Sequence, residues 1–321
     1  MFFLSMRMYI LVALMFAVLY GVVSILSYSM GVFSIGFYLI FTVVLMLIQF
    51  MVGPKIIEWS MKVKYVEEEE FPELFQIIRD LAHKAEIPMP RVAVSGLSMP
   101  NAFAYGRWLK DGRVCVTQGL LKLLNPEELK AVLGHEISHI KNRDVLTITL
   151  LSVIPILLYR ISWYFLFFGG RGRRQGQNAA LIGLGTLVMY FITNLLVLYG
   201  SRIREYFADR GSVVLGNHPK YLASALYKLV YGNARVPREE IRQVEGVKAF
   251  FASDPSRSQI ELRELSQIDE DLSGDIGTEE LASLREKPIS LKGSDKFFEI
   301  FSTHPNMLKR IKRLSTYLKA G

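Results

Sequence analysis

Long hydrophobic blocks alternate with polar regions along this chain. Two blocks lie near the N-terminus, at 8–30 and 35–52, and two more lie at 147–168 and 179–199. Most of them approach or exceed the roughly 20 residues that a helix needs to cross a bilayer. Arg160 interrupts the third block, and an arginine is costly in lipid unless it faces protein or water. The pattern predicts a multi-pass membrane protein whose last two blocks are either full spans or a partly embedded hairpin.

The first block could also be read as a cleaved signal peptide. It is too long for the apolar core of a signal peptide, lacks an A-x-A-like cleavage site and is followed at once by the second block. We therefore expect it to remain as a membrane anchor.

Basic residues near the block ends predict the orientation, because cytoplasmic flanks carry the excess of Lys and Arg. The flanks expected on one side hold Arg7, Lys55, Lys62, Lys64, Lys141, Arg143, Arg202 and Arg204. The loop 27–34 has no Lys or Arg. We expect a cell-membrane protein with both termini and both polar regions in the cytoplasm. Arg171, Arg173 and Arg174 fit this orientation only if the last two blocks do not cross fully.

The composition excludes several classes of protein. Of the 321 residues, 51% are hydrophobic and 21% are charged, which excludes disorder for most of the chain. Cys115 is the only cysteine, so no intramolecular disulfide can form. The net charge is +8, but no long basic run accompanies it, and we expect no nucleic-acid partner.

The first polar region, 56–146, is predicted to be a small α/β unit. Helical periodicity covers 73–85, and alternation predicts a strand at 91–95. The segments 101–106 and 113–117 are predicted to form a hairpin.

The rest of the polar sequence is predicted to be mainly helical. Asn125 and Pro126 are typical of a helix N-cap and first position. Further helices are predicted at 201–215, 219–231, 257–268, 279–286 and 304–319. The expected fold is α+β, mainly α-helical, with a small antiparallel sheet. The expected divisions are 1–55 (two spans), 56–146 (sheet and first helices), 147–199 (second hydrophobic pair) and 200–321 (C-terminal helices).

The helix that follows Asn125 carries a metal-binding pattern. His135 and His139 are four residues apart, so both imidazoles lie on one helix face and can bind one metal ion. Glu136 lies one residue along and can reach the attacking water as a general base. With five histidines in the chain, chance placement of such a pair is rare.

A catalytic zinc ion usually takes a third protein ligand. Glu205 is the strongest candidate, and Asp209, one turn later, can accept a hydrogen bond from a ligand histidine. On spacing alone, Glu205 is equally well explained as a solvated charge on a mixed-charge helix. His83 and His218 lie in ordinary helix and turn contexts, and we expect both at the surface.

Several motifs in order resemble those of the HtpX-type membrane zinc metalloproteases, which are related to the CAAX prenyl proteases. They are two N-terminal spans, NAFA at 101–104, GHEISH at 134–139 with Asn142 and Asp144, a second hydrophobic pair, SRIREYFAD at 201–209 and STHPNMLKRI at 302–311. The resemblance implies a cytoplasmic zincin-type domain, with zinc held by His135, His139 and Glu205 and with Glu136 as the catalytic base.

The same resemblance implies further roles. It implies an edge strand that aligns the substrate backbone by strand addition, made of Asn101, Ala102, Phe103 and Ala104. His304 matches a His-Pro position that helps to stabilise the transition state. Arg204 and Arg310 either pair with carboxylates near the site or are structural.

A second metal pattern lies at 269–280, which reads DEDLSGDIGTEE. It matches the calcium loop of an EF-hand, with Gly274 at the sixth position and Ile276 at the eighth. The candidate calcium ligands are Asp269, Asp271, Ser273, Asp275 and Glu280. The alternative is an acidic linker that binds no ion tightly.

Together these features predict a membrane-integrated zinc endopeptidase that acts on misfolded or membrane proteins, with calcium as a candidate second ion. The alternatives are a CAAX-type or precursor-processing membrane protease, which usually has more spans, and an inactive metal-binding scaffold. Glu136 argues against the scaffold, because a structural metal site needs no general base.

Overall fold

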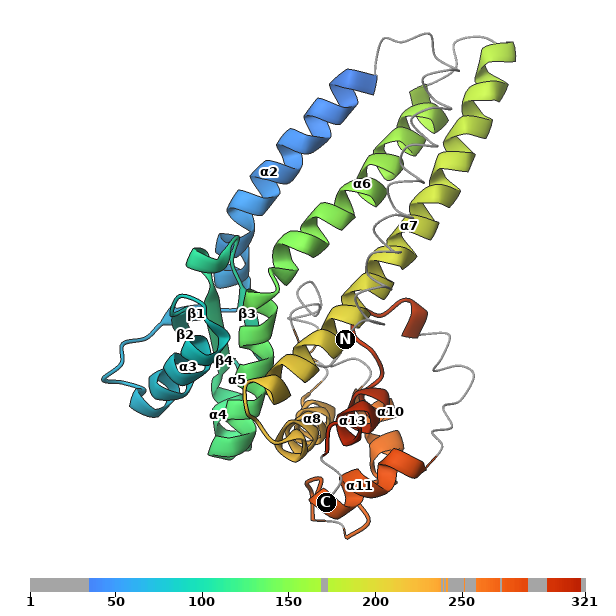
Figure 1. Ribbon diagram of the computed structural model, residues 1–321. Coiled ribbons are helices and arrows are strands. Elements are labelled where there is room, and N and C mark those ends of the chain that lie inside the picture. The colour runs from blue at the N-terminus through green and yellow to red at the C-terminus, as the bar shows by residue number, and fades with distance from the viewer. Residues whose placement is uncertain are drawn as a thin grey trace. The chain divides into compact units, whose positions relative to one another are not determined.

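The computed structural model describes residues 35–168, 173–237, 239, 241, 251, 258–271, 273–287 and 299–318 (Figure 1). The chain divides into two units, one of 1–52 with 146–203 and one of 53–145 with 204–321. The predicted first span, at 8–30, lies outside the described residues.

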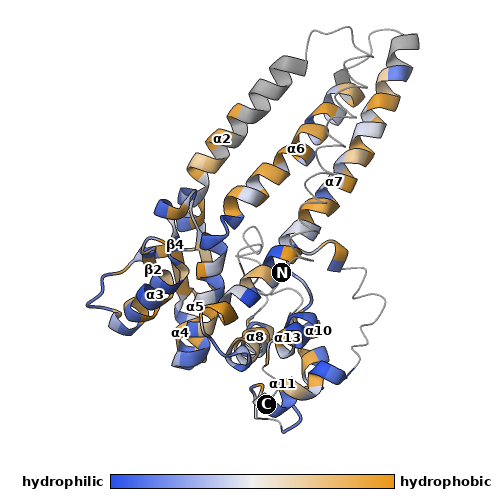
Figure 2. Cartoon of the chain, viewed as in Figure 1, coloured by the Kyte–Doolittle hydropathy of each residue, from blue (hydrophilic) through white to orange (hydrophobic). Residues whose placement is uncertain are grey.

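Long helices contain the other three hydrophobic blocks. They are α2 (Ile35–Ser60), α6 (Asp144–Phe168) and α7 (Arg173–Val214). Among the described residues, two stretches, Asp144–Leu166 and Asn178–Val214, are long and apolar enough to cross a membrane. Apolar positions recur along both α6 and α7 (Figure 2). The number of spans and their orientation stay predictions.

A four-stranded sheet belongs to the second unit. Its strands are β1 (Val63–Tyr65), β2 (Arg91–Ser95), β3 (Ala102–Tyr105) and β4 (Arg113–Thr117), in the order β1-β2-β4-β3. The predicted hairpin is confirmed, because β3 pairs antiparallel with β4. The prediction of a purely antiparallel sheet is wrong. Since β3 lies on the far side of β4, β2 and β4 become neighbours that run in the same direction, and the sheet is mixed.

The other described elements that lie within this unit are helical. They are α3 (Pro72–Ala85), η1 (Leu109–Asp111), α4 (Gln118–Leu123), α5 (Pro126–Lys141), α8 (Pro219–Ala234), α10 (Ser258–Leu265), α11 (Thr278–Glu286) and α13 (Met307–Ser315). The predicted C-terminal helix begins later than expected, because Asn306 caps α13 and accepts a hydrogen bond from the backbone of Leu308. The segment 201–215 continues α7 and is not a separate helix.

The start of α5 follows the prediction from sequence. The Asn125 side chain accepts from the backbone of Glu128, and Glu128 in turn accepts from the backbone of Asn125. This reciprocal cap satisfies two amide groups that a helix start leaves free. Glu128 also accepts hydrogen bonds from Ser224 and Lys228 of α8, which fixes α5 against that helix.

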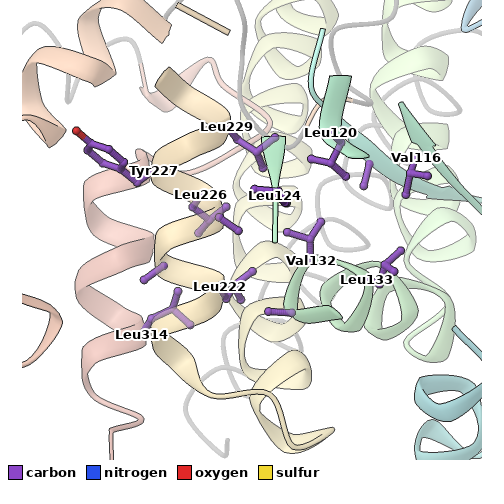
Figure 3. Close-up of a cluster of buried hydrophobic side chains, with 14 of the residues drawn as sticks. Val116, Leu120, Leu124, Val132, Leu133, Leu222, Leu226, Tyr227, Leu229 and Leu314 are labelled. Atoms are coloured by element: carbon purple, nitrogen blue, oxygen red, sulfur yellow. The ribbon is translucent and has the colours of Figure 1, made fainter. Parts of the chain in front are cut away.

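The core fixes α5 from several directions. Figure 3 shows Val132 and Leu133 of α5 in a cluster with Leu222 and Leu226 of α8, and all four are buried. The same cluster includes strand residues such as Val116 and leucines that follow β4. The helix that carries both candidate histidine ligands is therefore anchored by apolar packing over its length.

Candidate metal centre

The two histidines of α5 converge as the spacing predicts. The Nε2 atoms of His135 and His139 lie 3.0 Å apart. His135 is buried and only 4% of its surface is exposed, while His139 is half-buried. Two imidazole nitrogens so close together are arranged to share one ion.

The third donor comes from α7. Glu205 Oε2 lies 3.6 Å from His135 Nε2, and Glu205 Oε1 lies 3.5 Å from His139 Nε2. Glu205 is 5% exposed, so its interpretation as a solvated surface charge is wrong. Ligand atoms of these three residues all lie within 4.8 Å of one another.

Small residues allow α5 and α7 to pack closely, so that Glu205 reaches the two histidines. A Cβ at Gly134 would lie 2.3 Å from the side-chain nitrogen of Asn217, and a Cβ at Gly211 would lie 2.2 Å from the hydroxyl of Ser138. The hydroxyl of Ser212 donates to the carbonyl of Ala131 at 2.6 Å, which ties the two helices together. Larger side chains at these glycines would push Glu205 away from the histidines.

The donor set fits a zinc ion. Tetrahedral zinc with metal–nitrogen bonds of about 2.0–2.1 Å places its ligand atoms about 3.3 Å apart. The two Nε2 atoms are 3.0 Å apart, and each Nε2 lies 3.5 or 3.6 Å from one of the two Glu205 oxygens, which is around that value. Two imidazoles and one carboxylate leave one tetrahedral position free for water or substrate, as catalytic zinc requires.

Each histidine is oriented by a second carboxylate. Asp209 Oδ1 lies 2.9 Å from Nδ1 of His135, as the sequence suggested. Asp144 Oδ2 lies 2.6 Å from Nδ1 of His139, a role that the sequence reasoning missed. A proton on each Nδ1 leaves Nε2 with its lone pair directed at the shared position.

The turn after α5 brings Asp144 back toward His139. Arg143 has φ of +54°, in the left-handed region, so the chain reverses direction immediately after the helix. Arg204 pairs with Asp144 and donates to the carbonyl of Asn142 at 2.9 Å. Of the two alternatives for Arg204, the pairing with a carboxylate is the one observed.

Arg310 of α13 pairs with two carboxylates at once. Its Nε and one terminal nitrogen lie 3.0 and 2.6 Å from the two oxygens of Asp209. The other terminal nitrogen lies 3.0 Å from Oε2 of Glu205. Arg310 is fully buried, and its carboxylate partners outweigh burial and raise its pKa. It balances the negative charge that the donor set concentrates here.

The pKa values of the two histidines are shifted in opposite directions. Burial lowers the pKa of His135, but the carboxylates of Asp209 and Glu205 outweigh burial and raise that pKa to about 9. Burial lowers the pKa of His139, and the neighbouring His135 lowers it further. His135 is therefore the more basic of the two imidazoles.

Glu136 points toward the sheet. It is 4% exposed, and burial raises its pKa against the opposing effect of His135 and His139. It also receives a backbone hydrogen bond from Ala104 of β3. Among the described strands, β3 pairs only with β4, so β3 is an edge strand of the sheet. The family resemblance implied an edge strand at these residues.

The other predicted residues are placed as follows. His304 lies just before α13, with Nδ1 3.3 Å from Oε2 of Glu205. Asn101 is buried at the start of the edge strand, and its backbone N–H donates to Thr117. The surface positions predicted for His83 and His218 are confirmed, because both are exposed.

Comparisons with known proteins agree with this geometry. Residues 68–318 match the profile of peptidase family M48. The chain is 44% identical over 227 residues to a protease HtpX homolog of Methanothermobacter thermautotrophicus, covering 71% of this chain and 86% of that protein. It is 36% identical over 316 residues to protease HtpX homolog 2 of Methanosarcina acetivorans, covering 98% and 95%. The crystal structure of S. mikatae Ste24p has a similar fold, with a TM-score of 0.51 and 16% identity, covering 98% of this chain and 67% of that one.

Proposed function

The chain belongs to peptidase family M48, and on that premise we propose that it is a membrane-integrated zinc endopeptidase. The observation that carries this proposal is the convergence of His135, His139 and Glu205, with the buried Glu136 beside them. These three residues would hold the zinc ion, which would supply a Lewis acid for the scissile carbonyl and for the attacking water.

Glu136 is proposed as the general base. It takes a proton from the attacking water and later gives it to the leaving amine, so the same carboxylate serves both halves of the reaction. Burial raises the pKa of Glu136, which makes it a stronger base than an exposed carboxylate.

The edge strand is proposed to bind the substrate backbone. An extended peptide that pairs with residues 101–104 would continue the sheet by main-chain hydrogen bonds. The contact between Ala104 and Glu136 supports this, because it places the proposed base next to the strand. His304, 3.3 Å from Glu205, is proposed to stabilise negative charge on the carbonyl oxygen in the transition state.

Membrane or misfolded proteins are the proposed substrates. The helix with both histidines ends at Lys141, and the apolar helix α6 begins at Asp144, so the catalytic sequence is joined directly to a candidate span. The basic flanks of the hydrophobic blocks support a cytoplasmic orientation in the cell membrane.

The test compares wild type with Glu136→Gln, both purified in detergent and loaded with zinc. Each is incubated with casein and with an unfolded membrane protein, and bound zinc is counted in parallel. We expect one zinc ion per chain in both proteins and cleavage by wild type alone. Zinc in both with cleavage in neither would favour a scaffold or a narrow precursor-processing enzyme, and cleavage by the variant would remove Glu136 from its proposed role.

A further inference from the structure

The segment 269–280 has no part in the peptidase chemistry described above. It carries six carboxylates and no Lys or Arg, in a chain whose net charge is +8. Oxygen-bearing side chains stand at its first, third, fifth, seventh and twelfth positions, which is the order of ligands in an EF-hand loop. We propose that this loop binds one calcium ion.

The described backbone has the features that the loop pattern requires. Gly274, at the sixth position, has φ of +83°, where a side chain would be strained. Its N–H donates to Asp269 at 3.1 Å, which closes the first half of the loop. Ile276, at the eighth position, is 2% exposed and belongs to the main core cluster, so the loop is anchored to the protein.

Two helices flank the loop in the expected order. α10 ends at Leu265, and α11 begins at Thr278, the tenth position of the loop. Leu265 and Leu281 are fully buried on either side. This is the helix–loop–helix arrangement that holds calcium ligands in register.

The acidic side chains lie close together in the folded structure as well as in the sequence. Ligand oxygens of Asp269, Asp271 and Glu280 lie within 4.8 Å of one another, although the last two residues are not deeply buried. Ser273 donates to Asp275 at 3.2 Å on the same loop. Carboxylates this close repel one another unless a cation lies between them.

Asp269 supplies an independent indication of a cation site. The residue is 5% exposed, and its Oδ1 is buried without a hydrogen-bond partner among the described residues. Its other oxygen accepts from the hydroxyl of Tyr227 at 2.9 Å and from Gly274. Burying a carboxylate oxygen without a donor or cation is costly, so the structure presents an oxygen prepared for an ion.

No basic side chain takes the place of that ion in the described part of the chain. The ion pair at this loop joins Lys287 to Glu270, which is at the second position and is not a ligand in the pattern. The donor set consists entirely of oxygen atoms, which suits calcium and does not suit zinc.

A bound calcium ion would stabilise α10 and α11, the helices that pack against α13, which carries Arg310. The side chain of Asn306, the cap of α13, donates to Glu264 of α10 at 2.7 Å. Leu284 of α11 and Ile311 of α13 share the main core cluster. Calcium would therefore stabilise the C-terminal helices, and this role is independent of whether the chain is a peptidase.

Terbium luminescence and calorimetry test the proposal on the full-length protein in detergent. Terbium replaces calcium at oxygen sites, and the Tyr227 hydroxyl, 2.9 Å from Asp269, is close enough to sensitise its emission. We expect one calcium ion per chain with Kd between about 10⁻⁶ and 10⁻³ M, and displacement of bound terbium by calcium at concentrations well below those of magnesium.

Three variants decide where the ion binds. Glu280→Gln and Asp271→Asn should each weaken calcium binding at least tenfold, and the second change is at an exposed residue, so it should not affect folding. Glu279→Gln is the matched control, because Glu279 is exposed and lies outside the ligand pattern, and it should bind as wild type does. No calcium binding to wild type at about 10 mM, equal binding in all variants, or equal displacement by magnesium would overturn the proposal.

Discussion

The metal centre on α5 and α7 and the acidic loop 269–280 are built in opposite ways. The donors of the metal centre come from two helices that are distant in sequence. Two of these donors, His135 and Glu205, are buried, and arginine side chains balance the negative charge. The donors of the acidic loop come from one short segment, and one of them, Asp271, is exposed and has no ion pair among the described residues. Arginine side chains balance the charge of the first donor set, whereas a bound ion would balance the carboxylates of the second.

The largest expected effect follows loss of the third ligand. Glu205→Ala removes the one carboxylate that completes the histidine pair, so we expect no retained zinc and no casein cleavage. Calcium binding at 269–280 should be unchanged, because the loop shares no donor with the cluster. Zinc and calcium counts on the same preparation check this. Loss of both ions would mean that the two regions are not independent.

Removal of Arg310 tests how much the fold depends on the buried charges. Arg310→Leu leaves Asp209 and Glu205 buried beside one another, and we expect about 3–5 kcal/mol of lost stability. Lys309→Leu on the same helix is the control. It removes a pair with Glu299 in which the lysine is more exposed than Arg310, and it should cost less stability than Arg310→Leu. Denaturant unfolding in detergent measures both, and equal effects would contradict the importance of burial.

Asp144 is expected to affect zinc binding through its contact with His139. Asp144→Asn keeps the size of the side chain but loses the charge that holds the Nδ1 proton, so zinc affinity should fall about 10- to 100-fold. Competition with a zinc chelator measures the affinity, and excess zinc should restore much of the cleavage rate. An unchanged affinity would show that the contact with His139 is incidental.

A smaller effect is expected from pH. The pKa of His135 is raised to about 9, so without metal its ion pairs stabilise the fold fully below about pH 6.5, and this contribution is lost as pH rises through 9. Zinc needs the deprotonated imidazole, so the rise in Tm on adding zinc should grow between pH 6.5 and 9. The rise on adding calcium should stay constant, because carboxylates remain ionised throughout this range. A zinc effect that shrinks with pH would contradict the assignment.

Local features were predictable from the sequence, and features that depend on chain reversal were not. The spacing of His135 and His139 and the cap at Asn125 are properties of one helix. The contact of Asp144 with His139 depends on the left-handed turn at Arg143, which no spacing rule predicts. Gly134 and Gly211 were visible signals of close helix packing, but their partner helices become evident only in the fold.

The mixed sheet shows the same limit. The sequence predicted β2 and the hairpin of β3 and β4, yet it did not predict that β2 pairs in parallel with β4. β1 has three residues, all of them at least partly exposed, and is too short to show a clear period.

X-ray absorption at the zinc edge tests the central claim most directly, because it reports the atoms bound to the metal in the whole protein. The account predicts two imidazole nitrogens and one or two oxygens at about 2.0–2.2 Å, with the imidazole signal of any zinc still bound reduced in His139→Ala. A sulfur neighbour at about 2.3 Å, or a shell of oxygens without imidazole, would contradict the assignment of His135, His139 and Glu205.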